Sequence, residues 1–151
     1  MQVIEYFSSD RKNHWLNQIQ KSDWSAGQYL YELLQLKHFK SVLGETSKVL
    51  LLVNDDELIS FCTYTEIDDI QPTNLTPWMG FVYTFPKHRG HRYVGRLFQE
   101  VERLAKANAV HDLYISTDTT GLYEKYGCTF YQMMNDINGE PSRVYRKHIE
   151  F

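Results

Sequence analysis

The sequence predicts an α/β (α+β) fold in which about four helices flank a mixed, mostly antiparallel sheet of six to seven strands. Three observations predict it. Runs rich in aromatic and β-branched residues, typical of strands, recur along the chain. Short turns with asparagine, aspartate or glycine separate several of these runs, as in hairpins. Residues 79–85 lead through a cationic turn into an amphipathic helix, a pattern typical of α/β proteins.

The composition is that of a soluble globular chain. Its 151 residues fit one domain, residues 1–151, and 42% are hydrophobic and 23% charged. The net charge of −3 provides no general attraction to nucleic acid, so no nucleic-acid partner is expected. We find no signal peptide, lipidation motif or apolar stretch of membrane-spanning length, and therefore expect a cytoplasmic protein without a membrane partner.

The first half of the chain predicts three strands and two helices. Residues 48–53 are almost continuously apolar, as in a strand buried on both faces, and the turn at residues 54–56 joins them to the next strand. Residues 8–10 offer helix N-caps, and Gly44 is placed to end the second helix. The predicted strands are residues 2–7, 48–53 and 58–65, and the predicted helices are residues 11–20 and 26–43.

The second half predicts a strand, the amphipathic helix and a C-terminal set of strands. Residues 66–77 contain acids and prolines and predict a surface loop. The strand after the helix should run parallel to the strand before it, because a helical crossover joins them. Asn138–Gly139 predicts a hairpin between the last two strands. The predicted strands are residues 78–85, 112–117, 128–134 and 143–149, with a short helix at residues 120–126 that ends at Gly127.

The turn between strand and helix predicts an anion site. Backbone N–H groups at the start of a helix point outward without partners, and the helix dipole favours a negative charge there. Such a turn can also be purely structural. Basic or potentially basic residues follow one another through it: His88, Arg89, His91, Arg92 and Arg96.

Cysteine and histidine usage argues against a metal site or a disulfide. Cys62 and Cys128 each lie in or beside a strand-like run and are expected to be buried thiols. The histidines show no spacing typical of zinc ligands, so no metal is expected.

Two motifs resemble the GNAT superfamily of acyl-CoA-dependent N-acetyltransferases. One is Pro86-x-x-Arg89-Gly90 before the amphipathic helix, and the other is the run Gly-Leu-Tyr-Glu-Lys-Tyr-Gly at residues 121–127. The order of elements also fits that fold. Arg92 stands where the family usually has glycine, and Val94 where it has glycine or alanine; a right-handed turn could host Arg92.

The resemblance implies acetyl-CoA as co-substrate and assigns residues to it. The backbone of Val82, Tyr83 and Thr84 would pair with the pantetheine arm, and Tyr123 would be the general acid near the thioester sulfur. Tyr123 could instead be a helix residue that packs on the sheet. The pyrophosphate would lie on the amides of Arg89, Gly90, His91, Arg92, Tyr93, Val94 and Gly95.

A general base is not assigned from the sequence. The strand at residues 78–85 has no acid, so Glu66, Asp68, Asp69 and Asp118 are candidates by their place in the topology, although each also fits a solvated loop charge. The acids of residues 66–69 would suit a cationic amine.

The predicted function is transfer of an acetyl group from acetyl-CoA to a primary amine, by direct attack in a ternary complex. The alternative is an acyl-CoA-binding sensor or interaction module without catalysis. The expected acceptor is a small-molecule or peptide amine, and the sequence is compatible with a homodimer.

Overall fold

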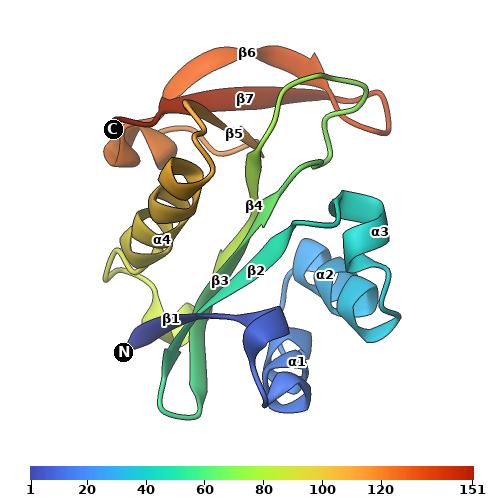
Figure 1. Cartoon of the computed structure of the whole chain (residues 1–151), viewed down its shortest axis with the longest axis vertical. Coiled ribbons are helices and arrows are strands. Elements are labelled where there is room, and N and C mark those ends of the chain that lie inside the picture. Colours follow the sequence, from blue (N-terminus) through green and yellow to red (C-terminus); the bar gives the residue numbers. More distant parts are fainter.

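The computed structural model describes residues 1–151 and contains one seven-stranded sheet with the order β1-β2-β3-β4-β5-β7-β6 (Figure 1). The strands are β1 Gln2–Glu5, β2 Lys48–Asn54, β3 Glu57–Thr65, β4 Trp78–Thr84, β5 Asp112–Thr117, β6 Thr129–Asn135 and β7 Pro141–His148. All neighbouring strands are antiparallel except β4 and β5, which are parallel. The predicted fold class and the predicted parallel pair are therefore confirmed.

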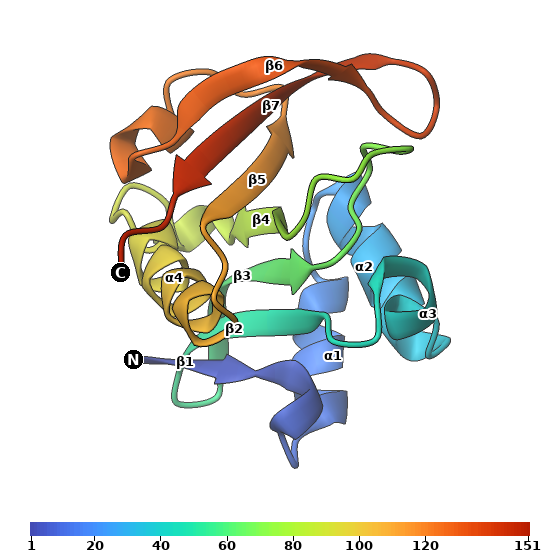
Figure 2. The same cartoon turned by 45° about the horizontal axis from the view of Figure 1, so that its top comes forward.

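Four α-helices cover the sheet, and 3-10 turns connect several elements. They are α1 Lys12–Gln20, α2 Ser25–Gln35, α3 Phe39–Leu43 and α4 Val94–Ala107, with the 3-10 turns η1 Tyr6–Ser8, η2 Pro86–His88 and η3 Tyr123–Tyr126. Helix α4 lies on one face of the sheet, and α1 to α3 lie on the other (Figures 1 and 2). None of the helices is long and apolar enough to cross a membrane.

Each face of the sheet has its own hydrophobic core, because alternate residues of a strand point to opposite faces. On β2, Leu50 and Leu52 pack on the side of α4, where Leu97, Phe98 and Val101 are buried. The alternate residues of β2 point to the opposite face and pack against α1, α2 and α3; they are Val49, Leu51 and Val53. The predicted burial of this strand on both faces is confirmed.

The second predicted helix differs from the structure. The predicted helix 26–43 is two helices, because the chain turns at Lys37, whose φ is +59°, and the His38 N–H donates to the Leu33 carbonyl at 2.8 Å. This contact closes α2 as a C-terminal cap does. Gly44, with φ of +118°, ends α3.

The predicted strand at residues 2–7 and the predicted helix at residues 120–126 are both shorter in the structure. After Glu5 the chain enters η1, which the Glu5 side chain caps by accepting from the Ser8 N–H at 3.1 Å. The C-terminal segment forms only the four-residue turn η3. Gly127 ends it, with φ of +84°, a conformation that glycine adopts without a steric penalty.

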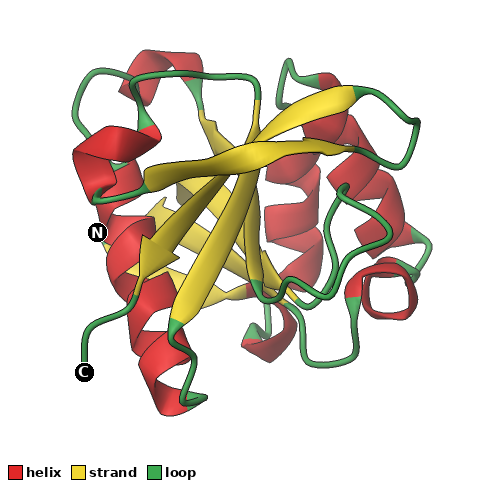
Figure 3. Cartoon of the chain, turned by 90° about the horizontal axis from the view of Figure 1, so that it is seen from above, coloured by secondary structure: helices red, strands yellow, loops and turns green.

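The sheet divides between β4 and β5. These strands share one registered pair, Trp78 with Tyr114, and then diverge. Trp78 is fully buried and donates its indole N–H to the Leu75 carbonyl at 2.8 Å, which fixes the point of divergence. Seen from above, the β6–β7 hairpin crosses over the rest of the sheet (Figure 3).

Candidate active site

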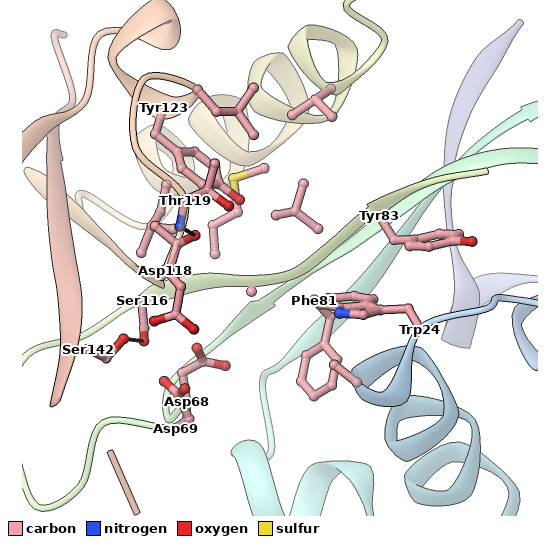
Figure 4. A pocket seen from close by; sticks show the side chains of 18 of the residues that line it. Trp24, Asp68, Asp69, Phe81, Tyr83, Ser116, Asp118, Thr119, Tyr123 and Ser142 are labelled. Carbon is pink, nitrogen blue, oxygen red and sulfur yellow. Dashed lines mark hydrogen bonds between the residues drawn. The ribbon is translucent and has the colours of Figure 1, made fainter. Parts of the chain in front are cut away.

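A cleft of about 1470 Å³ opens where β4 and β5 diverge. Its walls come from β4, β5, η3, the start of α4, parts of α2 and α3, the β6–β7 turn and the loops that follow α1, β3 and β5 (Figure 4). Every predicted cofactor-binding residue lines it except His91 and Gly95, and the predicted acid Tyr123 lines it too. The topology therefore brings together motifs that lie about thirty residues apart in the sequence.

A bulge in β4 frees backbone groups at the cleft. Gly80 pairs with Thr63 and Tyr83 pairs with Phe61, so the register leaves Phe81 and Val82 without a partner on β3, and β5 has already diverged. Phe81 has φ of +49°, which is rare for a bulky side chain and is typical of functional sites. The bulge therefore interrupts the regular β3–β4 ladder beside the cleft.

The loop before α4 presents a run of free amides. The Arg89 N–H donates to the Pro86 carbonyl at 3.3 Å, and the Gly95 N–H donates to the Arg92 carbonyl at 3.0 Å. The amides between them, from Gly90 to Val94, have no acceptor in the protein, and no side chain caps the helix start. This arrangement fits a pyrophosphate, because consecutive N–H groups at a helix start favour an anion.

The loop conformation explains why glycine is usual where this chain has Arg92. Arg92 has φ of +58°, in the left-handed region, so the expectation of a right-handed turn at this position is wrong. The conformation costs a non-glycine residue about 1 kcal/mol but keeps the neighbouring amides pointing outward. Gly95 does not widen the loop, because it faces Tyr126, whose ring a Cβ would approach to 3.4 Å.

Only part of the predicted positive charge reaches the cleft. His88, Arg89 and Arg92 line it, whereas Arg96 donates to the Met1 carbonyl at 3.2 Å. The Arg89 guanidinium donates to the Thr84 carbonyl at 2.9 Å and lies 5.4 Å from the centre of the Tyr83 ring. Arg89 therefore tethers the loop to the end of β4.

Tyr123 begins η3 and points into the cleft from the α4 side (Figure 4). Its ring packs at 6.2 Å from Phe98 and 6.3 Å from Tyr145, and only 6% of it is exposed. Burial, with smaller effects of Cys62 and Cys128, raises the pKa of Tyr123 well above its ordinary value. The phenol therefore stays protonated and can donate a hydrogen bond throughout the neutral range.

The predicted base candidates separate in the structure. Glu66 accepts from the Thr46 N–H at 3.1 Å and from the Thr46 hydroxyl at 2.6 Å, and these bonds lower the pKa of Glu66. It does not line the cleft, whereas Asp68, Asp69 and Asp118 do (Figure 4). A carboxylate held by hydrogen bonds is a poor proton acceptor, so Glu66 does not suit the role of base.

Asp68 is the buried member of this group. Only 8% of it is exposed, and a Cβ on Gly80 would come within 2.7 Å of its Oδ1 atom, so the carboxylate lies directly against β4 where the bulge begins. Burial, followed by the charge of Asp69, raises the pKa of Asp68 to about 7. The prediction that residues 66–77 form a surface loop is wrong here and at Ile70, which is 1% exposed and packs with Trp78.

An aromatic wall opposite Asp68 had no sequence signal. Trp24, in the break between α1 and α2, stacks on Tyr83 with ring centres 5.7 Å apart, and Phe81 lies 6.5 Å from Trp24 (Figure 4). The Tyr83 hydroxyl donates to Asp23 Oδ1 at 2.5 Å. Only the fold brings residues 23 and 24 beside β4, and no spacing in the sequence connects them.

The comparisons with known proteins give one family model and several solved structures of similar fold. The model of the acetyltransferase (GNAT) family matches residues 12–128. An aminoglycoside 6'-acetyltransferase type Ii is similar at 17% identity, with 100% and 99% of the two chains covered and a TM-score of 0.70. An aminoglycoside 6'-N-acetyltransferase complexed with coenzyme A has 15% identity, 100% and 98% coverage and a TM-score of 0.66.

A GNAT-family acetyltransferase from Staphylococcus aureus Mu50 is similar at 13% identity, with 98% of each chain covered and a TM-score of 0.63. At these identities the solved structures establish the fold alone. The comparison with curated proteins finds no match.

The buried carboxyl of Asp68 predicts an unusual dependence of stability on pH. A carboxyl whose pKa is near 7 in the folded chain and 3.8 when unfolded binds more protons when folded, so its contribution is lost as pH rises from about 4 to 7. Asp68→Asn removes this loss. Its stability relative to the original chain should rise across this window by about 2 to 4 kcal/mol and level off above pH 7.

Urea unfolding at a series of pH values from 4 to 8 measures this difference. Asp10→Asn, at an exposed residue outside the cleft, is the control and should give a curve parallel to that of the original chain. A parallel curve for Asp68→Asn would contradict the raised pKa.

Proposed function

Because this chain belongs to the GNAT acetyltransferase family, we propose that it moves an acetyl group from acetyl-CoA to a primary amine by direct attack in a ternary complex. Acetyl-CoA supplies the reactive thioester. The observation that carries the proposal is the meeting in one cleft of free loop amides, the bulged β4, Tyr123 and the buried Asp68. A donor bound along β4 and an amine beside Asp68 would then be held together, which is the main source of rate in such transfers.

The donor side of the cleft would bind through backbone groups. The free amides from Gly90 to Val94 would hold the pyrophosphate, and the freed backbone of Phe81 and Val82 would pair with the pantetheine arm together with Tyr83 and Thr84. These contacts need no particular side chain. For this reason Arg92 and Val94 can stand where smaller residues are usual.

Asp68 is our candidate for the general base. An amine with a pKa near ~10.4 must lose a proton before it attacks, and transfer to a carboxylate with an ordinary pKa of ~3.8 would cost roughly 9 kcal/mol. Because burial raises the pKa of Asp68 to about 7, the cost falls to roughly 5 kcal/mol. Its place beside Gly80 puts it next to the bulge where the reacting carbonyl would lie.

Tyr123 would assist the leaving thiolate. As the amine nitrogen bonds to the carbonyl carbon, the carbon–sulfur bond breaks and negative charge develops on sulfur. A protonated phenol donates a hydrogen bond that strengthens as this charge develops. Cys62 and Cys128 take no part, because both are buried and burial raises the pKa of each thiol.

The proposed function is tested with acetyl-CoA and a panel of primary amines. We expect release of free coenzyme A thiol only when an amine is present, and calorimetry should show acetyl-CoA binding without one. Binding with no thiol release on any amine would instead support the acyl-CoA-binding module.

Replacing Tyr123 tests the acid. Tyr123→Phe should lower kcat by about 10- to 100-fold and leave acetyl-CoA affinity unchanged, because the phenol acts only as charge develops on sulfur. Tyr131→Phe removes a hydroxyl outside the cleft and should keep full activity. Full activity in Tyr123→Phe would exclude the acid role.

The pH profile tests the base. Because Asp68 must be ionised to accept a proton, kcat/KM should fall tenfold per pH unit below about 7. Asp68→Asn should lower kcat/KM by about 100-fold and remove the break near pH 7, so that the remaining dependence on pH is that of the amine's own protonation. Glu66→Gln, at the acid outside the cleft, should retain the profile, and an unchanged profile in Asp68→Asn would refute our assignment.

A further inference from the structure

The loop of residues 88–95 at the start of α4, which would hold the pyrophosphate, is called the phosphate loop below. Carboxylates collect at the end of the cleft away from it. Asp68 and Asp69 come from the loop after β3, Asp118 from the loop after β5, and Asp136 from the β6–β7 turn. The Ile137 N–H donates to the Asp69 carbonyl at 2.7 Å, which holds two of these segments together. We call these four residues the acidic wall.

The acidic wall is not neutralised by the protein. None of its carboxylates forms an ion pair, although other acids of the chain do. The basic residues that line the cleft lie on the phosphate loop and on η3; they are His88, Arg89, Arg92 and Lys125. The cleft is therefore basic at the donor end and acidic at the other end.

Like charges also act on one another within the wall. The negative charges of Asp136 and Asp118 contribute to the raised pKa of Asp69, after burial, and Asp69 contributes to that of Asp68. Such repulsion destabilises the free protein unless a cation enters. Asp68 is the buried member of the wall: it is more than nine-tenths buried, points into the cleft, and has the Asp69 backbone N–H but no side-chain donor or cation as partner (Figure 4).

The aromatic wall described above, formed by Trp24, Phe81 and Tyr83, faces these carboxylates, and Tyr29 extends it. Trp24 and Phe81 point toward the cleft from the opposite side (Figure 4), and Tyr29 lies 6.2 Å from Phe81 with 47% of its surface exposed. The hydrogen bond from Tyr83 to Asp23 and the stacking on Tyr83 hold Trp24 in place. Aromatic faces next to carboxylates suit an organic cation with an apolar body.

The chemistry of transfer decides how many charges that cation needs. The attacking amine must be neutral, so a monoamine has no positive charge left when it reacts. A diamine keeps its second ammonium group, which the outer carboxylates Asp69, Asp118 and Asp136 can still attract. This second charge adds to the stabilisation of the transition state and so raises kcat/KM over that of a monoamine.

We propose that the acceptor is an organic polycation, with one amino group beside Asp68 and at least one further ammonium group on the outer carboxylates of the acidic wall. This inference rests on the proposed function and names its substrate class. The apolar body between the amino groups would lie against the aromatic wall.

Three amines of equal chain length test the proposal. They are 1,4-diaminobutane, butylamine and 4-aminobutanoate, which place a cation, a neutral methyl group and an anion at the far end. We expect kcat/KM to fall in this order, by about tenfold between diamine and butylamine at low salt. Added salt should reduce the ratio, because it screens exposed charges.

A double variant identifies the carboxylates responsible. Asp69→Asn with Asp118→Asn should bring the ratio of kcat/KM for the diamine over butylamine close to one. The control is Asp10→Asn with Glu45→Gln, which changes the net charge equally at exposed residues outside the cleft and should keep the ratio. A ratio unaffected by the cleft variant would overturn the proposal.

The outcomes separate this inference from the proposed function. If the amines are acetylated without the expected order, the polycation proposal is wrong and the transferase stands. If no amine in the wider panel is acetylated, the transferase proposal fails. Calorimetry with the coenzyme A-loaded protein then decides the inference, because equal affinities for 1,4-diaminobutane and butylamine would overturn it.

Discussion

The pairing of β4 with β5 is limited to Trp78 and Tyr114, and the site depends on where that pairing stops. Within a continuous sheet, the backbone of β4 would be used on both edges by its neighbours. Here the parallel neighbour β5 diverges from β4, while the antiparallel partner β3 stays paired with it. Trp78 is fully buried at the point of divergence, so the cleft is built into the packed sheet.

Backbone conformation then prepares the donor end. The N–H groups from Gly90 to Val94 have no acceptor in the protein and precede a helix, a position that favours an anion. The bulge at Phe81 and the turn at Arg92 both use left-handed conformations that are unfavourable for their residues. Each is retained where it directs backbone groups into the same space, as expected when local strain serves binding.

The two ends of the cleft solve different electrostatic problems. At the donor end, amides and a few basic side chains suit phosphates without requiring a large positive field, which agrees with a chain of net charge −3. At the other end, carboxylates without ion-pair partners leave a negative field. Asp68 combines both requirements of a base for amines, because the negative surroundings attract an ammonium group and burial raises its proton affinity.

The sequence by itself determined most of the architecture. Strand and helix positions follow from short-range patterns, such as the apolar run of β2 and the apolar stripe of α4, since periodicity reports which faces are buried. The motifs around Arg89 and Tyr123 were visible for the same reason, because each is contiguous. One exception is at Lys37, where a local turn ends a helix earlier than the apolar pattern does, and the other is η3, which begins at Tyr123, later than predicted.

Only the tertiary structure decided which acid faces the cleft and what stands opposite it. Glu66 and Asp68 are two residues apart and equally acidic in sequence, yet Thr46 binds one while Gly80 and the protein interior enclose the other. The meeting of Trp24 with Phe81 and Tyr83 likewise depends on strands and helices distant in the chain. Proton affinity and recognition are set by surroundings, and those surroundings exist only once the chain has packed.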